Sequence, residues 1–252
     1  MIDISQLTKI AKEASLAAGQ EILKIYNSED FGVEMKGDNS PLTFADQASH
    51  QVIVSQLKAT GLPILSEEGR DIPYSERKDW GYFWMVDPLD GTKEFIKRNG
   101  EFTVNIALIY QDKPIMGVVY APVLDWLYWG NEENGAWKSV EKGNPIKLER
   151  PDTESIRTIV ASRSHLSPET KEFIDRYPEA EVISMGSSLK LMLVAEGKAQ
   201  VYPRFAPTME WDTAAAHGVV SAGGGTVTSY PDGTMQLVYN KENLLNPWFI
   251  CR

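Results

Sequence analysis

The segment Asp87-Pro88-Leu89-Asp90-Gly91-Thr92 brings two carboxylates together with a glycine and a hydroxyl. Two acids three positions apart are common in a chain with 35 acidic residues, so the spacing alone has little weight. The setting has more weight, because Asp87 follows the apolar run Tyr82–Val86 and Gly91 opens a helix-forming stretch. Carboxylate oxygens suit a hard cation, and the unpaired N–H groups of a helix start suit an anion. The segment therefore predicts a site for a metal ion and a phosphate group.

Asp46, Glu67 and Asp212 are carboxylates outside this segment, and each has an ordinary structural interpretation. Asp46 can be a charge that the helix dipole favours at an N-terminus, and Asp212 can cap a helix. Glu67, next to Glu68, can belong to a solvated loop. Taken one at a time these residues do not indicate a site, so their joint pattern has to decide.

Three segments together resemble a known family. Ser66–Gly69, Asp87–Thr92 and Trp211–Ala215 resemble, in order and spacing, the three signatures of the inositol monophosphatase superfamily of Mg²⁺-dependent, lithium-sensitive phosphatases. The resemblance covers nearly the whole chain. Within the superfamily, Gly91–Ala107 and Gly186–Lys190 look most like the bacterial 3′(2′),5′-bisphosphate nucleotidases. Those enzymes remove the 3′-phosphate of adenosine 3′,5′-bisphosphate, a by-product of sulfate assimilation.

The resemblance implies a set of metal ligands and a catalytic group. The ligands for two or three Mg²⁺ ions would be Glu67, Asp87, the Leu89 carbonyl, Asp90 and Asp212. Such an all-oxygen set suits Mg²⁺, and converging carboxylates without a cation would repel one another. Thr92 and Asp46 would activate the attacking water, and Glu67 would help to position it. No covalent phosphoenzyme is implied.

A second group of residues is expected to select the substrate. It comprises Gly91, Thr92, His165, Ser187, Ser188, Lys190, Arg204 and Asp212. Lys190 lies one turn into a predicted helix, so its ammonium and nearby hydroxyls can hold a spared 5′-phosphate, and Arg204 can add a fork of donors. His165 is expected to pack on or hydrogen-bond to the base. The alternative for Lys190 and Arg204 is solvation at the surface, and the alternative for His165 is a loop position without a ligand. His217 is expected to have a structural role.

The bulk composition bounds the class of protein. The chain has 252 residues, a formal net charge of −10 and one cysteine, Cys251. The acidic balance argues against binding a nucleic acid polymer and leaves a small phosphorylated molecule as the expected partner. No signal-like start or apolar run of roughly 20 residues is seen, so a cytoplasmic protein without a transmembrane segment is expected. Peripheral contact with the inner membrane surface and the oligomeric state are left open.

The elements that must position these residues change character along the chain. Apolar periodicity predicts helices at 3–26 and 45–58, strands at 63–66 and 82–86, and an antiparallel meander over 102–137. After about residue 150, strands at 156–161, 181–184, 199–204 and 235–239 alternate with helices at 168–176, 189–196 and 211–221. This pattern predicts an α/β protein with an α+β first part, 1–148, and an α/β second part, 149–252. The resemblance implies a layered αβαβα sandwich of the sugar-phosphatase type.

The leading functional hypothesis is hydrolysis of adenosine 3′,5′-bisphosphate to AMP and phosphate by attack of a metal-activated water. An inositol or sugar monophosphatase of the same superfamily is the second enzyme hypothesis. Lys190 and Arg204 argue against it, because they suit a second anionic group on the substrate. A nucleotide-binding regulator without turnover is the third hypothesis, and the presence of every expected ligand and of Thr92 disfavours it.

Overall fold

A seven-stranded sheet forms the centre of the protein. The computed structural model describes residues 2–28, 32, 34–35, 41–69, 71–150, 155–162 and 167–252. The sheet has the order β3 (Ile64–Ser66), β4 (Tyr82–Asp90), β5 (Thr103–Tyr110), β6 (Lys113–Ala121), β7 (Trp126–Asn131), β8 (Gly135–Val140) and β9 (Ile146–Lys147). β3 and β4 are parallel, and all later neighbours, which follow one another along the chain, are antiparallel.

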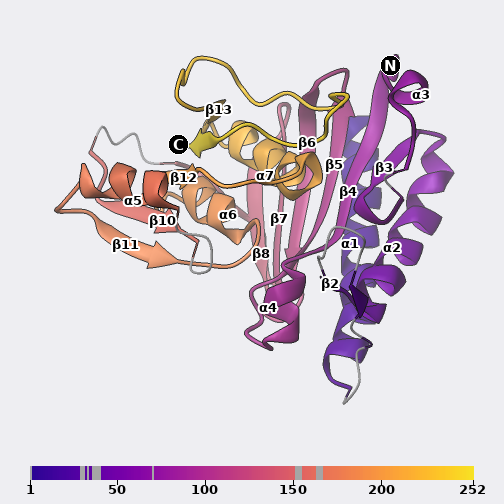
Figure 1. Cartoon of the computed structure of the whole chain (residues 1–252). Helices are drawn as coiled ribbons and strands as arrows, with labels where there is room; N and C mark the ends of the chain where they lie inside the picture. The colour runs from indigo at the N-terminus through magenta and orange to yellow at the C-terminus, as the bar shows by residue number, and fades with distance from the viewer. Residues whose placement is uncertain are drawn as a thin grey trace.

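Two long helices cover one face of this sheet. α1 (Ile4–Tyr26) and α2 (Phe44–Leu57) lie side by side over it (Figure 1). Alternate strand residues, such as Trp84 and Val86, share a core with both helices, whereas Phe83 and Met85 belong to the core on the opposite face. The alternation of a strand therefore supplies two separate apolar layers from one continuous apolar run.

Helices α6 (Leu189–Ala195) and α7 (Glu210–Ala222) cover the other face. Gly117 on β6 and Gly218 on α7 allow a close approach of backbone to backbone. A Cβ at Gly117 would overlap the carbonyl oxygen of Ala215, and one at Gly218 would come within 2.9 Å of the backbone of Met116. This contact fixes where the middle of α7 lies relative to the sheet.

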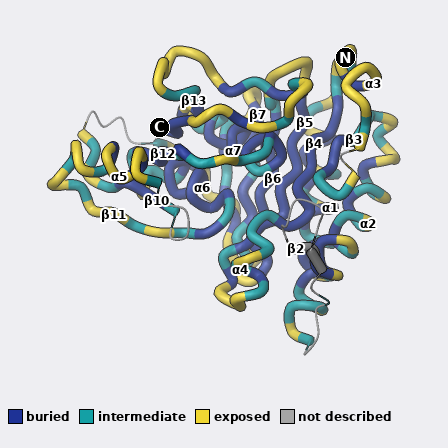
Figure 2. The backbone as a smooth tube through the Cα atoms, viewed as in Figure 1, coloured by how far each residue is buried: buried dark blue, intermediate teal, exposed yellow. Residues whose placement is uncertain are grey.

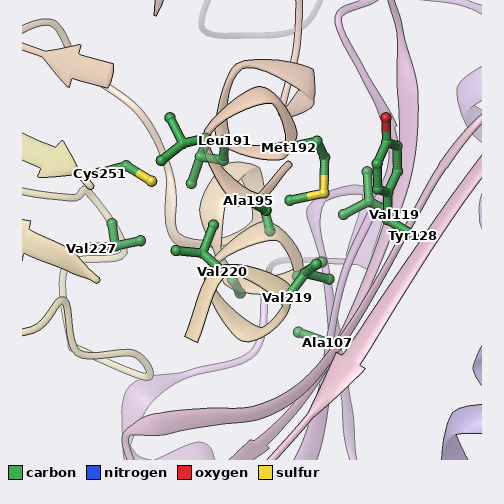
Figure 3. Close-up of a cluster of buried hydrophobic side chains, with 14 of the residues drawn as sticks. Ala107, Val119, Tyr128, Leu191, Met192, Ala195, Val219, Val220, Val227 and Cys251 are labelled. Carbon is green, nitrogen blue, oxygen red and sulfur yellow. The ribbon is translucent and has the colours of Figure 1, made fainter. Parts of the chain in front are cut away.

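A smaller β layer lies beyond α6 and α7. It contains β10 (Thr158–Ala161) paired with β11 (Glu181–Ser184), and β12 (Tyr202–Arg204), β14 (Phe249–Cys251) and β13 (Val227–Ser229) in that order. Figure 3 shows the two helices between the layers, with these side chains labelled: Ala107, Val119, Tyr128, Leu191, Met192, Ala195, Val219, Val220, Val227 and Cys251. Helix α5 (Pro168–Asp175) packs outside this layer through Phe173. The αβαβα order predicted for the fold is confirmed, and Figure 2 shows the buried centre.

Two strand predictions were wrong. Residues 235–239 form no strand, because Met235 is 66% exposed and Gln236 makes only an isolated bridge to Thr228. The C-terminal segment forms a strand of this sheet instead, because β14 lies between β12 and β13. Strand β4 also continues to Asp90 instead of ending before Asp87, with a bulge in its pairing to β5.

The remaining elements are short. They are β1 (Glu34–Met35), β2 (Pro41–Leu42), α3 (Tyr74–Arg77), α4 (Thr92–Ile96) and the 3₁₀ turns η1 (Lys58–Thr60) and η2 (Glu67–Gly69). No helix in the described part of the chain is both long and apolar enough to cross a bilayer. The division into 1–148 and 149–252 stays a prediction, with α6 and α7 of the second part packing on the sheet of the first.

Candidate active site

The bulge of β4 separates the two aspartates of the central motif. Asp87 is buried, and its Oδ1 accepts a hydrogen bond of 3.0 Å from the N–H of Leu89. Ser49 of α2 donates a 2.6 Å bond to the carbonyl of Pro88, which ties the bulge to the helix layer. Pro88 has no N–H, so it fits a point where the ladder is interrupted. As a result, Asp90 reaches the surface of a cavity while Asp87 lies behind it.

Asp46 caps helix α2 and also contacts Thr92. It is the third residue of α2, and its Oδ2 accepts bonds of 2.7 Å and 2.6 Å from the N–H and hydroxyl of Thr43, the N-cap. Its Oδ1 accepts a 3.2 Å bond from the hydroxyl of Thr92. Gly91, with φ of 94°, provides the left-handed turn that starts α4 at Thr92. The capping interaction therefore holds Asp46 where it can orient Thr92.

Asp212 and Glu67 reach the cavity lining from different elements. Asp212 is in the first turn of α7, and its Oδ2 accepts a 2.8 Å bond from the N–H of Met209. The helix-capping interpretation is correct, and the same side chain also lines the cavity. Glu67 begins the 3₁₀ turn after β3 and lines the same cavity.

One cavity of about 570 Å³ gathers most of the predicted site. Its lining includes Glu67, Asp90, Gly91, Thr92, Ser187, Ser188, Lys190, Arg204 and Asp212. Asp46, Asp87 and Leu89 lie outside the lining, although Asp46 and Leu89 each contact Thr92. His165 lies outside the described residues. The volume is in the range of pockets that enclose a small organic ligand.

Burial and mutual repulsion disturb the acids of the site. Burial raises the pKa of Asp87 well above its ordinary value, and the nearby Glu67, Asp90, Asp212 and Asp46 raise it further. Burial, Asp90 and Glu67 likewise raise the pKa of Asp212, against the lowering effect of the Met209 N–H and Arg204. A group of carboxylates with this charge density binds protons until a cation replaces them.

The donor set fits Mg²⁺ in chemistry. Among the described residues, no three His, Cys, Asp or Glu side chains are already drawn together into a metal-binding group. The fit therefore depends on the kind of donor: Glu67, Asp87, Asp90 and Asp212 offer only carboxylate oxygens, and Leu89 offers a carbonyl. Oxygen donors of this kind, with room for water, are what Mg²⁺ prefers.

The loop before α6 is attached to the central motif. Ser187 donates from its hydroxyl, and Ser188 from its N–H, to the same oxygen of Asp90, each over 2.6 Å. The N–H of Gly186 donates to the carboxylate of Glu101 over 2.8 Å. Ser187 takes a left-handed φ of 54°, which is uncommon for serine. These contacts place the second half of the chain directly on a predicted metal ligand.

The two predicted cations, Lys190 and Arg204, line the same cavity. Lys190 is only 7% exposed, and its Nζ donates a 2.6 Å bond to the carbonyl of Ser187. Burial lowers the pKa of Lys190 to about 8, with a further lowering from Arg204 and opposing effects from Asp90 and two glutamates. Arg204 donates a 3.1 Å bond to the carbonyl of Pro207, and its buried Nε has no acceptor among the described residues. Surface solvation is excluded for Lys190, which instead forms part of the cavity wall.

Several lining residues were not predicted from the sequence. Lys93 on α4, Lys97 at the C-cap of α4 and Tyr202 on β12 line the cavity. The Lys190 ammonium lies 5.6 Å from the centre of the Tyr202 ring. Asn105 and Thr103 lie behind the lining on β5 and are fully buried. Asn105 had a usable signal, because a carboxamide at a buried position within an apolar strand is unusual. The others had none, since exposed lysines and strand tyrosines are common.

His217 is buried on α7 and is not part of the cavity lining. Its Nδ1 lies 2.9 Å from the hydroxyl of Tyr239 and its Nε2 lies 3.1 Å from Oε1 of Gln236. Burial lowers the pKa of His217 to about 4, so the ring is neutral near pH 7. This environment agrees with the structural role expected for it.

Comparison with known proteins points to one family across the full chain. A model of the inositol monophosphatase family matches residues 3–247. The chain is 46% identical over 253 residues to the 3′(2′),5′-bisphosphate nucleotidase CysQ of Escherichia coli K12, covering 98% of both chains. It is 35% identical to the protein of the same name from Aggregatibacter actinomycetemcomitans, covering 98% of this chain and 91% of that one.

Solved structures agree with this similarity. The crystal structure of CysQ from Bacteroides thetaiotaomicron, described as a bacterial member of the same family, superposes with a TM-score of 0.87 at 48% identity and covers 98% of this chain and 97% of that chain. An inositol monophosphatase from Anabaena superposes with a TM-score of 0.75 at 26% identity, covering 99% and 91%. Both the sequence and the fold are thus similar to those of known phosphatases over nearly their whole length.

Proposed function

Because the chain belongs to the inositol monophosphatase family, we propose that it is a Mg²⁺-dependent 3′(2′),5′-bisphosphate nucleotidase. The substrate is adenosine 3′,5′-bisphosphate, and the products are AMP and phosphate. One observation supports this best: the cavity is lined by the carboxylates Glu67, Asp90 and Asp212 and also by the cations Lys190 and Arg204. A substrate with two separate phosphates matches a cavity with two kinds of phosphate-binding chemistry.

The metal ligands in this proposal are Glu67, Asp87, the Leu89 carbonyl, Asp90 and Asp212, for two or three ions. When held by these ligands, Mg²⁺ would supply positive charge for the phosphate oxygens and would lower the pKa of a bound water, so that a nucleophile would be available at neutral pH. The family is typically Mg²⁺-dependent and lithium-sensitive. The ligands also lose the mutual repulsion that raises the pKa of Asp87 and Asp212.

Thr92 and Asp46 act on the attacking water. The Thr92 hydroxyl donates its hydrogen bond to Asp46, so the lone pairs of the Thr92 oxygen are left to accept a hydrogen bond from the attacking water. Glu67 positions the same water. Buried Asp46 keeps the hydroxyl in this orientation, because its other oxygen is held by Thr43. The reaction needs no nucleophilic side chain and no covalent intermediate.

Lys190 and Arg204 hold the 5′-phosphate that is not hydrolysed. Ser187 and Ser188 position the loop, and Gly91 lines the part of the cavity that takes the scissile phosphate. His165 lies outside the described residues, and its contact with the base stays a prediction. The low exposure of Lys190 strengthens its attraction to an anion, because little water screens the charge. The protein is expected to act in the cytoplasm, where its small-molecule substrate is formed.

The experiment is a comparison of three substrates. Mg²⁺-dependent phosphate release is measured from adenosine 3′,5′-bisphosphate, AMP and inositol 1-phosphate, with Asp90→Asn as the inactive control. A preference for the bisphosphate by at least roughly 100-fold in kcat/KM, or about 2.7 kcal/mol, is expected. Preference for inositol 1-phosphate would instead support the monophosphatase hypothesis. Tight binding of the bisphosphate without phosphate release would support a regulator.

A further inference from the structure

A continuous row of polar side chains runs behind the cavity from β5 to Asp90. Asn105 and Thr103 lie on β5, and Ser187 and Ser188 come from the loop before α6. The contacts are 2.6 Å between Asp90 Oδ2 and Ser187 Oγ, 2.6 Å between Ser187 Oγ and Thr103 Oγ1, and 2.8 Å between Thr103 Oγ1 and Ser188 Oγ. Ser188 Oγ then lies 2.9 Å from the Asn105 carboxamide. Thr103 and Asn105 are 0% and 1% exposed, so water does not interrupt the row.

The number of protons fixes the direction of this row. Each of the three hydroxyls has a single proton. Asp90 as a carboxylate can only accept, so Ser187 donates to it. Thr103 must then donate to Ser187, and Ser188 must donate to Thr103. The last contact, between Ser188 and Asn105, therefore needs its proton from Asn105.

In the observed rotamer, Asn105 directs its carboxamide oxygen towards Ser188, although the row needs a donor there. Its Oδ1 faces Ser188 Oγ and lies 3.3 Å from Thr103 Oγ1, while its buried Nδ2 has no acceptor among the described residues. An unpaired buried N–H group is costly. The two ends of a carboxamide have nearly the same shape, so a half-turn about χ2 puts Nδ2 beside Ser188. The carboxamide oxygen then takes the former position of Nδ2. One buried acceptor without a partner thus replaces two buried N–H donors without a partner.

We propose that Asn105 is a positioning residue that donates into a one-way hydrogen-bond chain, Asn105 to Ser188 to Thr103 to Ser187 to Asp90. The chain fixes Oδ2 of Asp90, which also accepts the N–H of Ser188. No partner of Oδ1 lies among the described residues, so this oxygen is the one offered to a cation. The inference rests on the proposed metal site, and it predicts that residues remote from the cation set its affinity.

The test measures metal binding without turnover. Mn²⁺ is titrated into the full-length protein and the free ion is followed by electron paramagnetic resonance, with circular dichroism to check folding. Asn105→Leu removes the donor at a similar volume, and Thr103→Val interrupts the chain without a change in size. Each is expected to weaken Mn²⁺ binding by roughly 10- to 100-fold. Thr103→Ser, the matched control, keeps the hydroxyl and is expected to stay within about threefold of the unmodified protein.

Asn105→Leu adds no charge, so a change in Mn²⁺ affinity in this variant reports on the hydrogen-bond chain alone. Unchanged or tighter binding in this variant overturns the inference while the metal site stands. If Asn105→Leu does not fold, equal affinities of Thr103→Val and Thr103→Ser overturn it. If the unmodified protein does not bind Mn²⁺, the proposed metal site itself is overturned. In that case Asp90→Asn and the unmodified protein give the same titration.

Discussion

The hydroxyl of Thr92 donates a 3.2 Å hydrogen bond to Oδ1 of Asp46, although 46 positions separate the two residues in the chain. One lies at the start of α4 and the other in the first turn of α2. The remaining oxygen of Asp46 caps its own helix through Thr43. A single buried carboxylate therefore both stabilises a helix end and fixes the direction of a hydroxyl that faces the cavity.

Removal of that hydroxyl is expected to slow the chemical step. Thr92→Val keeps the shape of the side chain but cannot accept a water proton, so kcat should fall by roughly 100- to 10,000-fold while KM changes little. Thr92→Ser keeps the hydroxyl and should retain most of the rate. Steady-state phosphate release at saturating Mg²⁺ measures both constants. A variant with raised KM and normal kcat would assign Thr92 to substrate binding instead.

Removal of the buried Lys190 ammonium is expected to weaken the use of the bisphosphate far more than that of a simple monophosphate. Lys190→Met should raise KM for adenosine 3′,5′-bisphosphate by roughly 10- to 100-fold, since a hydrogen bond to a charged group contributes about 1.5–3 kcal/mol. Hydrolysis of a simple monophosphate should change far less. Lys171→Met, at an exposed lysine paired with Asp175, is the matched control. Equal losses on both substrates would rule out a role for Lys190 in selection.

The same lysine predicts a pH dependence. Its pKa is lowered to about 8, so the free protein has the ammonium below that pH and loses it above. Affinity for the bisphosphate should therefore fall as pH rises through about 8, with KM increasing up to the value of Lys190→Met. Lys190→Arg stays charged and should remove the step. KM profiles between pH 6.5 and 9.5 provide the measurement, and an identical step in Lys190→Arg would assign it to another group.

His217 is expected to weaken the fold in acid. Its pKa is lowered to about 4 in the folded protein from an ordinary 6.5, so the unfolded chain binds the extra proton between these values. Stability is therefore complete above pH 6.5 and falls towards pH 4, by up to about 3 kcal/mol from this group. His217→Gln has no titrating ring and should show a shallower decline. Urea unfolding at several pH values tests this, and parallel curves for the two proteins would contradict it.

Mg²⁺ is expected to stabilise the folded protein, because the cation offsets the repulsion around Asp87 and Asp212. At 100 times its dissociation constant, an ion that binds only the folded state adds about 2.7 kcal/mol, or roughly 5–10 °C in Tm for a chain of this size. Asp90→Asn should show a much smaller shift. Calorimetry with and without Mg²⁺ measures it, and equal shifts in both proteins would place the ion elsewhere.

The local elements could be read from the sequence because their physics is local. The apolar periodicity at 3–26 and the continuous run before Asp87 required no knowledge of distant residues, and α1 and β4 form there. The strand prediction for residues 235–239 was wrong because strand pairing depends on distant segments. The apolar content of these residues suits a strand, but strand formation depends on which segment pairs along its length with a neighbour, and β14 takes the position between β12 and β13.

The sequence by itself determined the chemical set: the acids Asp46, Glu67, Asp90 and Asp212, in an order that resembles a known family. Only the tertiary structure decided how these groups are used. It buried Lys190, brought Ser187 onto Asp90 across 97 positions and placed Asn105 at the far end of a polar row. Burial and long-range contacts follow from how layers pack, and packing depends on all segments at once. Residue types name the available chemistry, whereas packing sets the charge, the partner and the direction of each group.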